Sequence, residues 1–389
     1  MEKLVTSNLK LGIIAGGQLG KMLIQDASKW NIATYILDKE CDCPAGKIAT
    51  EFVKGDQLNF ESVYNFGKKV DVITFELENI NVDALIKLKS EGVKIVPDPE
   101  ILLLIQDKGL QKQFYTSNKI PTPKYRLYAS ENEIRNDIAA HKLEFPFVQK
   151  LRKGGYDGKG VSIIRNTQDL DKLLSGASVV EELVAVSKEI AVIVARNEKG
   201  QIKSFPVVEM VFDNRANLVE KLVCPSLISH EHALKATQIA EKIIKNLNMT
   251  GLLAVELFID NQGEIWVNEV APRPHNSGHH TIESIVTSQY EQHLRAILNL
   301  PLGSTHIKMP SVMINLLGEE GYEGPVMYEG LSESMAIEGV KIHLYGKKET
   351  KPYRKMGHLT VVCTTLEGAI EKAEKVKNLI KVRSWNKNL

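Results

Sequence analysis

The sequence predicts an α/β protein of two or three domains, with a parallel-sheet unit first and mixed α+β units after it. Two observations support this. The 389 residues are too many for one ordinary core. Short β-branched runs alternate with amphipathic stretches over the first hundred residues and later follow one another closely. The 49 basic and 48 acidic residues nearly cancel, so we expect neither nucleic-acid nor membrane partners.

The N-terminal domain is predicted from three apolar runs, at 9–17, 32–38 and 71–76. Amphipathic stretches such as 18–30 separate them, as in βαβ units of a parallel sheet. We therefore expect an α/β domain that ends at about residue 97.

The rest of the chain predicts helices and shorter strands in mixed order. We expect helices at 100–117, 231–247, 281–298 and 364–378. We expect strands at 148–153, 161–165, 179–184, 189–196, 251–260, 264–270, 311–317, 340–345 and 358–363.

The expected cellular compartment is inferred from signals that are not found in the sequence. The first ten residues have no apolar signal segment, and no later run approaches 18 apolar residues. The four cysteines do not have zinc-site spacing. We expect a cytoplasmic protein with reduced thiols.

A first glycine motif, AGGQLG, spans Ala15 to Gly20 between a predicted strand and helix. It approximates the dinucleotide-binding fingerprint, and Asp38 ends the next strand where a ribose-binding acid would lie. Backbone N–H groups at a helix N-terminus bind many anions, so a generic phosphate site is favoured over NAD or a structural turn.

A second glycine motif, GGYDGKG, spans 154–160 between two predicted strands. It is not a Walker A loop, because Lys159 is followed by Gly160 and Val161 instead of Ser or Thr opening a helix. It predicts a hairpin whose backbone N–H groups cover a polyphosphate, with Lys150, Lys153 and Lys159 adding charge. A flexible hairpin connection is the alternative.

Two acids predict a metal site. Strands 251–260 and 264–270 form a predicted hairpin, and a turn centred on Gln262 and Gly263 places Glu256 directly opposite Glu269. Facing carboxylates in apolar strands are costly unless a cation lies between them. With Asn268 beside them, these oxygens suit Mg²⁺. A salt bridge to Lys or Arg is the alternative.

These motifs, together with VVEELV at 179–184 and VNEVAPRPHNSGH at 267–279, resemble the ATP-grasp superfamily. Within it, the chain is similar to the 5-(carboxyamino)imidazole ribonucleotide synthase family of purine biosynthesis, from about residue 10 to residue 360. The resemblance implies an ATP-grasp fold: a biotin-carboxylase-like α/β domain at 1–97, an ATP-grasp domain at 98–300 with a lid at about 121–187, and a small β-rich domain at 301–389. A homodimer is also implied.

The resemblance implies an ATP site and a metal site. Phosphates would meet Lys108, Lys150 and the glycine hairpin, adenine would meet 181–184, and Glu189 would bind ribose. Mg²⁺, with room for two ions and Mn²⁺ as a substitute, would bind Glu256 and Glu269. The implied ATP-binding residues are Lys108, Lys150, Gly154, Gly155, Tyr156, Asp157, Gly158, Lys159, Gly160, Glu181, Glu182, Leu183, Val184, Glu189, Asn268 and Glu269.

Three positions depart from the family pattern. Lys108 and Lys159 stand where relatives carry Arg, and Phe212 stands where relatives often carry a nucleotide-contacting His. Lysine keeps the charge without the bidentate fork of arginine. The Phe212 contact is therefore left out of the predicted site.

The implied reaction is ATP-dependent carboxylation of 5-aminoimidazole ribonucleotide by bicarbonate through carboxyphosphate. Lys159 and Arg273 would stabilise carboxyphosphate, Asp157 would accept the amine proton, and Tyr156 and His275 would orient bicarbonate. The implied ribonucleotide-binding residues are Gln18, Leu19, Glu78 (preferred over Glu76), Asn276, Lys347 and Arg354.

Alternatives remain open at this level. Lys347 and Arg354 lie in a charged run that is also typical of a solvated surface. A separate metal site formed by His275, His279 and His280 is another interpretation, although Mg²⁺ prefers oxygen ligands. Rival functions are a formate-using glycinamide ribonucleotide transformylase, a nucleotide sensor and an NAD-dependent oxidoreductase.

Overall fold

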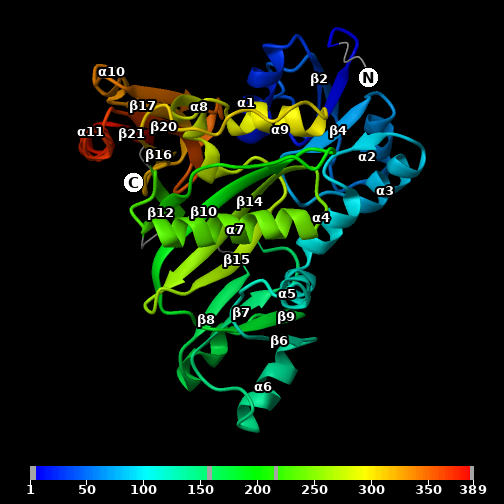
Figure 1. Ribbon diagram of the computed structural model, residues 1–389, viewed down its shortest axis with the longest axis vertical. Coiled ribbons are helices and arrows are strands. Elements are labelled where there is room, and N and C mark those ends of the chain that lie inside the picture. The colour runs from blue at the N-terminus through cyan, green and yellow to red at the C-terminus, as the bar shows by residue number, and fades with distance from the viewer. Residues whose placement is uncertain (1–5, 156–159, 214–217, 386–389) are drawn as a thin grey trace.

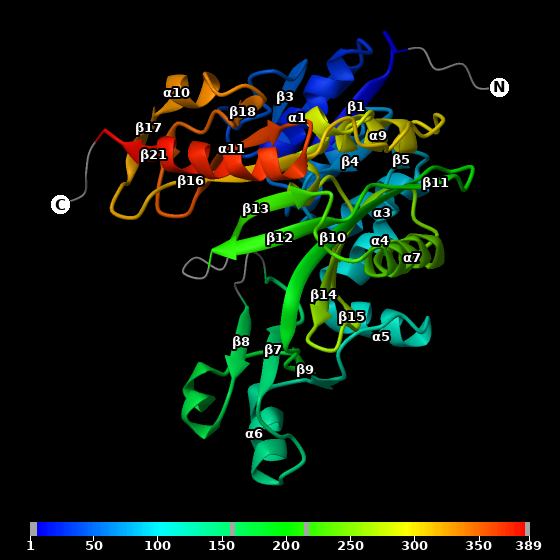
Figure 2. The same cartoon turned by 60° about the vertical axis from the view of Figure 1, so that its left-hand side comes forward.

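The computed structural model of the chain describes residues 6–155, 160–213 and 218–385. Figures 1 and 2 show the N-terminal sheet and the C-terminal strands together at one end of the long axis, with a small sheet at the other end. A large curved sheet connects these ends. Within the described residues, no helix is long and apolar enough to cross a membrane.

The N-terminal part is the predicted parallel α/β unit. Its five strands have the order β3-β2-β1-β4-β5, and all of their pairings are parallel. The elements are β1 (Lys10–Ile14), α1 (Gln18–Ser28), β2 (Ala33–Asp38), β3 (Glu51–Lys54), α2 (Phe60–Gly67), β4 (Val72–Phe75), α3 (Val82–Ser90) and β5 (Lys94–Ile95). The sequence did not predict β3 and β5, which are short edge strands with little apolar pattern.

Two helices connect this unit to a small antiparallel sheet of order β6-β9-β7-β8. The helices predicted at 100–117 are two, and Asp107 lies between them and caps the second. The elements are α4 (Pro99–Gln106), α5 (Lys108–Ser117), β6 (Tyr125–Tyr128), α6 (Glu131–Ala139), β7 (Phe147–Leu151), β8 (Val161–Ile164), η1 (Thr167–Lys172) and β9 (Ser178–Glu182). Strands β7 and β8 pair antiparallel, so the predicted glycine-rich hairpin is confirmed.

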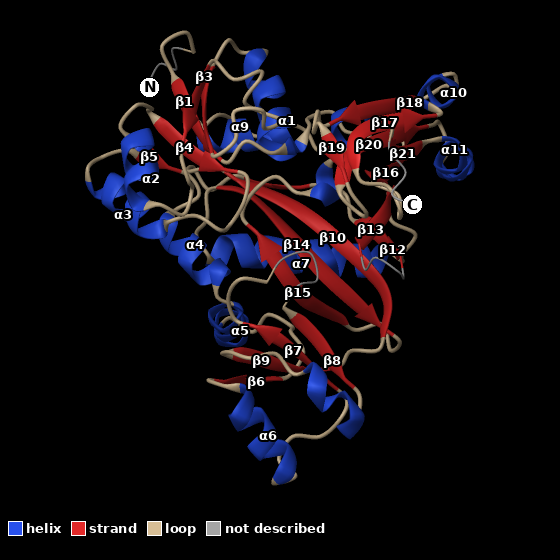
Figure 3. Cartoon of the chain, turned by 180° about the vertical axis from the view of Figure 1, so that it is seen from behind, coloured by secondary structure: helices blue, strands red, loops and turns tan. Residues whose placement is uncertain are grey.

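The large sheet has nine strands in the order β15-β14-β10-β12-β13-β16-β20-β18, with β11 paired to β10. Figure 3 shows it curving from the small sheet to the C-terminal strands. Its strands are β10 (Val186–Arg196), β11 (Ile202–Ser204), β12 (Val208–Asp213), β13 (Leu218–Cys224), β14 (Gly251–Asp260), β15 (Ile265–Ala271), β16 (Ser311–Leu317), β18 (Val340–Leu344) and β20 (Lys355–Val362).

Helix α7 (His230–Asn246) lies across β10, β14 and β15 (Figure 1). Its buried residues recur at helical spacing, and Ile239 and Ile243 meet Val192 of β10 and Val255 of β14 in one core. Each fully buried isoleucine contributes roughly 1.5–3 kcal/mol. This core fixes the position of the strands that carry the predicted acids.

The helix predicted at 281–298 is interrupted. It consists of α8 (Thr281–Ser284) and α9 (Gln289–Ile297), preceded by η2 (Asn276–Gly278). Ser288 begins α9 because its side chain accepts a hydrogen bond from the backbone N–H of Glu291. Residues Tyr290 and Leu294 of α9 join the core of the N-terminal unit, so α9 holds the N-terminal and large sheets together.

The C-terminal elements complete the fold. They include a three-stranded sheet of order β19-β17-β21 and the predicted Lys/Glu-rich helix, which packs on β16 and β20. The elements are β17 (Gly324–Glu329), α10 (Leu331–Met335), β19 (Glu349–Thr350), α11 (Leu366–Leu379) and β21 (Lys381–Ser384).

Candidate functional site

A cavity of about 830 Å³ lies between the small sheet, the large sheet and the loop after β4. It is lined by most of the residues that the sequence singled out, although they come from distant segments. The predicted residues that line it are Glu78, Lys108, Lys150, Gly154, Gly155, Glu181, Glu182, Leu183, Val184, Glu189, Glu256, Asn268, Glu269, Arg273, His275 and Asn276.

Other predicted residues lie elsewhere. Gln18, Leu19, Gly160, Lys347 and Arg354 do not line this cavity. Tyr156, Asp157, Gly158 and Lys159 lie outside the described residues.

The facing acids are confirmed. Glu256 of β14 pairs with Glu269 of β15, and the register shifts by one residue between Glu256 and Leu257. Nearer the turn, Leu257 pairs with Val267, which leaves Asn268 as the extra residue of a β-bulge. Adjacent strand residues normally face opposite sides, but here Asn268 and Glu269 both line the cavity. The predicted strand register next to the turn was therefore wrong by one residue, and the bulge restores the predicted pair.

The two acids have different electrostatic environments. The Lys108 ammonium lies 2.5 Å from Glu269 Oε2 and lowers the pKa of Glu269. Burial, and then the opposed Glu269, raise the pKa of Glu256, whose side chain is 17% exposed. His275 Nε2 is 3.5 Å from Glu256 Oε1. The predicted salt-bridge alternative thus describes Glu269 but not Glu256.

A second charge cluster lies where β7 and β9 meet α5. Glu181 is almost completely buried, with Lys112 Nζ at 3.2 Å and Lys150 Nζ at 3.3 Å. Burial would raise the pKa of Glu181, but the two ammonium groups outweigh it and the pKa is lowered. Lys150 also donates to Asn268 Oδ1 at 3.0 Å, which connects this cluster to the bulge.

Glu189 of β10 lies on the cavity wall beyond Lys150. Burial raises its pKa to about 7, and Lys150 opposes this shift. A half-buried carboxyl group beside the apolar residues Leu183 and Val184 suits a ligand that combines an apolar ring with hydroxyl groups.

The loop after β15 carries Arg273, His275 and Asn276 into the cavity. Arg273 Nη2 lies 2.8 Å from Glu78 Oε1, so the loop is joined to the segment after β4. Asn276 exchanges hydrogen bonds with Asn315 of β16, at 2.8 and 3.1 Å. These contacts fix the loop beside the acid pair.

The contacts of the N-terminal glycine motif contradict the dinucleotide site predicted for it. Gly17 N–H and Gly20 N–H both donate to the Glu76 carboxylate at 2.5 Å, and Gly16 N–H donates to Asp38 at 2.7 Å. The chain's own carboxylates therefore occupy the N–H groups of Gly16, Gly17 and Gly20, which the dinucleotide interpretation gave to a phosphate. Glu76 is committed to this loop, while Glu78, the preferred acid, lines the cavity.

The segment just before the predicted C-terminal basic residues contacts helix α1. Lys21 of α1 donates to the carbonyl oxygens of Leu344 and Tyr345, just before Lys347. Lys347 Nζ donates to Lys355 O at 2.7 Å, and Arg354 donates to Glu349 O at 2.8 Å. The segment that leads to Lys347 therefore contacts helix α1, which begins with Gln18 and Leu19, outside the cavity.

The alternative metal site at His275, His279 and His280 is not supported. His279 Nδ1 bonds Tyr290 Oη at 3.0 Å and His280 Nδ1 bonds Ser284 Oγ at 2.8 Å. Burial lowers the pKa of both histidines. In the part of the chain that the structure describes, no group of three or more His, Cys, Asp or Glu side chains could hold a metal.

Comparison with known proteins finds three family matches along the chain. Three domain families match: the ribonucleotide synthetase preATP-grasp domain at 9–106, the ATP-grasp domain at 113–290, and the phosphoribosylaminoimidazole carboxylase C-terminal domain at 311–372. The N5-carboxyaminoimidazole ribonucleotide synthase of Bacillus subtilis is 36% identical over 363 residues, which cover 92% of this chain and 93% of that protein. The chain belongs to the N5-carboxyaminoimidazole ribonucleotide synthase family.

Solved structures of this family have the same fold. The synthetase of Thermotoga maritima is 47% identical, with a TM-score of 0.89 and coverage of 97% of this chain and 99% of that one. The Aspergillus clavatus synthase in complex with ADP and 5-aminoimidazole ribonucleotide is 30% identical, with a TM-score of 0.88 and coverage of 96% and 99%. The predicted ATP-grasp fold is confirmed, and the chain is an ATP-grasp ligase with the synthase activity of this family in purine biosynthesis.

Sequence reasoning missed several residues of this synthase-family site. Lys112 follows Lys108 by one helical turn, so their spacing on α5 was an available signal. Lys355 lines the cavity and lies at the start of β20, next to the predicted Arg354. Phe212, left out of the predicted site, also lines the cavity. Arg152 also lines the cavity, but the sequence placed it only in the predicted strand at 148–153.

Proposed function

We propose that this chain uses ATP and Mg²⁺ to join bicarbonate to the exocyclic amine of 5-aminoimidazole ribonucleotide. One observation carries the proposal: the facing acids Glu256 and Glu269 share a cavity with the cations Lys108, Lys150 and Arg273. Carboxylates that bind a divalent cation, surrounded by phosphate-binding cations, are what phosphoryl transfer requires. The Aspergillus clavatus relative, crystallised with ADP and 5-aminoimidazole ribonucleotide, supports the choice of substrates.

We infer that the nucleotide lies along the wall formed by β9 and β10. Adenine would meet residues 181–184, and ribose would meet Glu189. The phosphates would then point toward Lys150, Lys108 and the first glycines of the hairpin. All of these residues line the same cavity, which supports a single extended ligand.

The donor set fits magnesium. Glu256, Glu269 and the Asn268 amide supply oxygen atoms, and Mg²⁺ commonly completes its coordination with phosphate oxygens and water. A second Mg²⁺ is compatible with two acids, and Mn²⁺ has similar ligand preferences. When bound, the ion would neutralise charge on the transferred phosphoryl group. Lys108, now on Glu269, would move onto a phosphate oxygen.

The proposed reaction has two steps. A bicarbonate oxygen attacks the γ-phosphorus, the bond to ADP breaks, and carboxyphosphate forms. The amine nitrogen then attacks the carboxyl carbon, either of carboxyphosphate or of CO₂ released from it. Phosphate leaves and the amine loses one proton. Arg273 and His275 are the proposed donors to bicarbonate, with Tyr156, Asp157 and Lys159 in the roles that the family pattern implies.

The ribonucleotide would extend from this centre toward the C-terminal basic loop. Glu78 and Asn276 would bind it inside the cavity, and its phosphate would reach Lys347 and Arg354 near Gln18 and Leu19. The contact of α1 with the loop before Lys347 supports this path. We also propose the three-domain division at 97 and 300, with a lid at about 121–187, and a homodimer.

An isotope experiment tests the mechanism. Bicarbonate labelled with heavy oxygen should give inorganic phosphate with one labelled oxygen per turnover, in a reaction that requires the ribonucleotide. Unlabelled phosphate from an active reaction would exclude carboxyphosphate. Formate in place of bicarbonate is the control, because robust turnover with formate would favour the transformylase alternative.

A further inference from the structure

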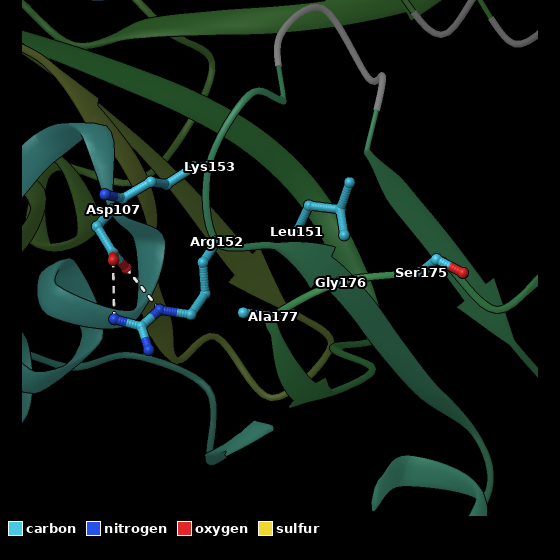
Figure 4. Close-up of a pocket in the computed structure, with 7 residues that line it drawn as sticks. All are labelled: Asp107, Leu151, Arg152, Lys153, Ser175, Gly176 and Ala177. Carbon is cyan, nitrogen blue, oxygen red and sulfur yellow. Dashed lines mark hydrogen bonds and ion pairs between the residues drawn. The ribbon is translucent and has the colours of Figure 1, made fainter. Parts of the chain in front are cut away.

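An ion pair joins the glycine-rich hairpin to the start of helix α5. Arg152 Nε and Nη2 donate to the two carboxylate oxygens of Asp107, each at 2.8 Å. Figure 4 shows the two side chains meeting between the helix and the end of strand β7. The Asp107 side chain is 8% exposed and the Arg152 side chain 30%, so the carboxylate of this planar, two-bonded pair is shielded from solvent while the guanidinium is partly exposed.

Asp107 is also the N-cap of α5. Its Oδ1 accepts the backbone N–H of Gly109 at 2.8 Å and of Leu110 at 3.3 Å. Burial would raise the pKa of Asp107, but the bonds from Arg152 and from these amides outweigh it and the pKa is lowered. The carboxylate is therefore ionised, and it fixes the direction in which α5 begins.

Backbone contacts hold the same junction. Lys108 N–H donates to Arg152 O at 2.9 Å, and Arg152 N–H donates to Ala177 O at 2.9 Å. Arg152 thus binds the residue after Asp107 with its backbone and Asp107 itself with its side chain. Together these bonds leave the first turn of α5 little freedom relative to β7.

Both sides of this junction lead into the cavity. On one side, Lys108 reaches Glu269 at 2.5 Å. On the other side, Lys153, Gly154 and Gly155 follow Arg152 directly and line the cavity. A lysine ammonium stands on a flexible four-carbon stem, so its position depends strongly on where its backbone is held.

We propose that Arg152 and Asp107 are a positioning pair that holds Lys108 and the described start of the glycine hairpin at one fixed separation, so that both meet the same ATP phosphates. This inference rests on the proposed function, because it takes Lys108 and the hairpin to be phosphate-binding. Arg152 then acts on the reaction through Lys108 and through the hairpin backbone.

A matched ion pair separates positioning from simple stability. Arg135 binds Glu131 on helix α6 through Nε and Nη2, at 2.8 and 2.7 Å from the one oxygen Oε1, in the same part of the chain but not on the cavity wall. Arg135→Gln is therefore the control for Arg152→Gln. Asp107→Asn is the second test variant, because asparagine keeps the helix cap but removes the charge.

The experiment compares steady-state kinetics for ATP and for the ribonucleotide. Arg152→Gln and Asp107→Asn should each lower kcat/KM for ATP by about 10- to 100-fold, while KM for the ribonucleotide changes less than about twofold. Arg152→Lys should not restore activity, because it lacks the fork. Arg135→Gln should stay within about twofold of the parent protein in all parameters.

A double-variant cycle tests the route of action. If Arg152 acts largely through Lys108, adding Arg152→Gln to Lys108→Gln should lower kcat/KM for ATP by much less than Arg152→Gln does alone. The proposal would be overturned if the effects of Arg152→Gln and Lys108→Gln on kcat/KM for ATP multiplied fully in the double variant. It would also be overturned if Arg152→Gln and Asp107→Asn both kept kcat/KM for ATP within twofold of the parent, or if the variants affected both substrates equally. If either Arg152→Gln or Asp107→Asn does not fold, the other variant still tests the proposal.

Failure of the proposed function would appear separately. If the parent protein forms no ADP in response to the ribonucleotide, the substrate assignment is wrong. The pair is then tested by Mg·ATP protection against thermal unfolding. A smaller ATP-induced shift in Arg152→Gln than in Arg135→Gln supports the positioning pair, and equal shifts overturn it.

Discussion

Glu256→Gln and Glu269→Gln should change the stability of the ligand-free protein in opposite directions. Glu256 is 17% exposed, and burial and the opposed acid raise its pKa, so replacing this acid with neutral glutamine should remove the cost of burying it and stabilise the fold by about 1–3 kcal/mol. Glu269 holds Lys108, whose side chain is 20% exposed. Because Glu269 itself is 45% exposed toward the cavity, losing it should cost about 1–2 kcal/mol, below the value for a fully buried pair.

Both variants should nevertheless lose activity for the same reason. Each leaves Mg²⁺ one charged ligand short, and we expect turnover to fall by at least about 100-fold, because even outer-shell partners of a metal cost 10- to 100-fold. Urea unfolding without nucleotide measures the stability difference, which should be about 2–5 kcal/mol between the variants. ADP formation measures turnover, and Mg·ATP protection against thermal unfolding measures binding at the site.

The outcome has two independent parts. If Glu256→Gln is no more stable than Glu269→Gln, the electrostatic difference between the two acids is wrong. If either variant keeps normal turnover and normal Mg²⁺-dependent protection, that acid is not a metal ligand.

Three further predictions concern other parts of the molecule. Lys347→Ala and Arg354→Ala should raise KM for the ribonucleotide about 10- to 100-fold with little change for ATP, and equal effects on both would contradict separate phosphate sites. Burial lowers the pKa of His280 and His293 to about 3, from 6.5 in the unfolded chain, so their contribution to stability is complete above pH 6.5 and is lost as pH falls. Each should cost roughly 2 kcal/mol between pH 7 and pH 5, and replacing either with glutamine should flatten the urea-unfolding profile over that range; an unaltered profile would disprove this. Gly17→Ala should destabilise the N-terminal unit by about 1–3 kcal/mol, because its Cβ would lie 2.2 Å from the carboxylate that caps the loop, and an unchanged melting temperature would contradict that contact.

The sequence predicted elements with strong local patterns and missed those defined by their neighbours. The β-branched runs of β1, β2 and β4 and the amphipathic pattern of α7 are visible without any tertiary information. Strands β12 and β13 are mixed in polarity, and only pairing with β10 and β16 makes them strands. The break between α8 and α9 depends on the Ser288 cap, a local signal inside a helical pattern that was not recognised.

The residues of the candidate site also differ in how far the sequence predicted them. The acids were found because two like charges in facing strands have few structural explanations, and a hairpin register can be counted. The dinucleotide interpretation of the N-terminal glycine loop was wrong at Gly17 and Gly20, because local sequence cannot say that Glu76, 59 residues after Gly17, accepts their N–H groups. Arg152 and Lys112 were missed because their partners become neighbours only when α5 packs against β7 and β9.

The continuity of the large sheet has a consequence for how this chain can be divided. Strand β13 is bonded to β12 on one side and to β16 on the other, so the backbone ladder crosses the proposed boundary at residue 300 without a gap. Cutting the chain there would expose the N–H and C=O groups of Lys221 to Cys224 as an open edge, which is a template for aggregation. The last ninety residues are therefore not a detachable module, and grafting them between relatives would require β13 and β16 to be exchanged together.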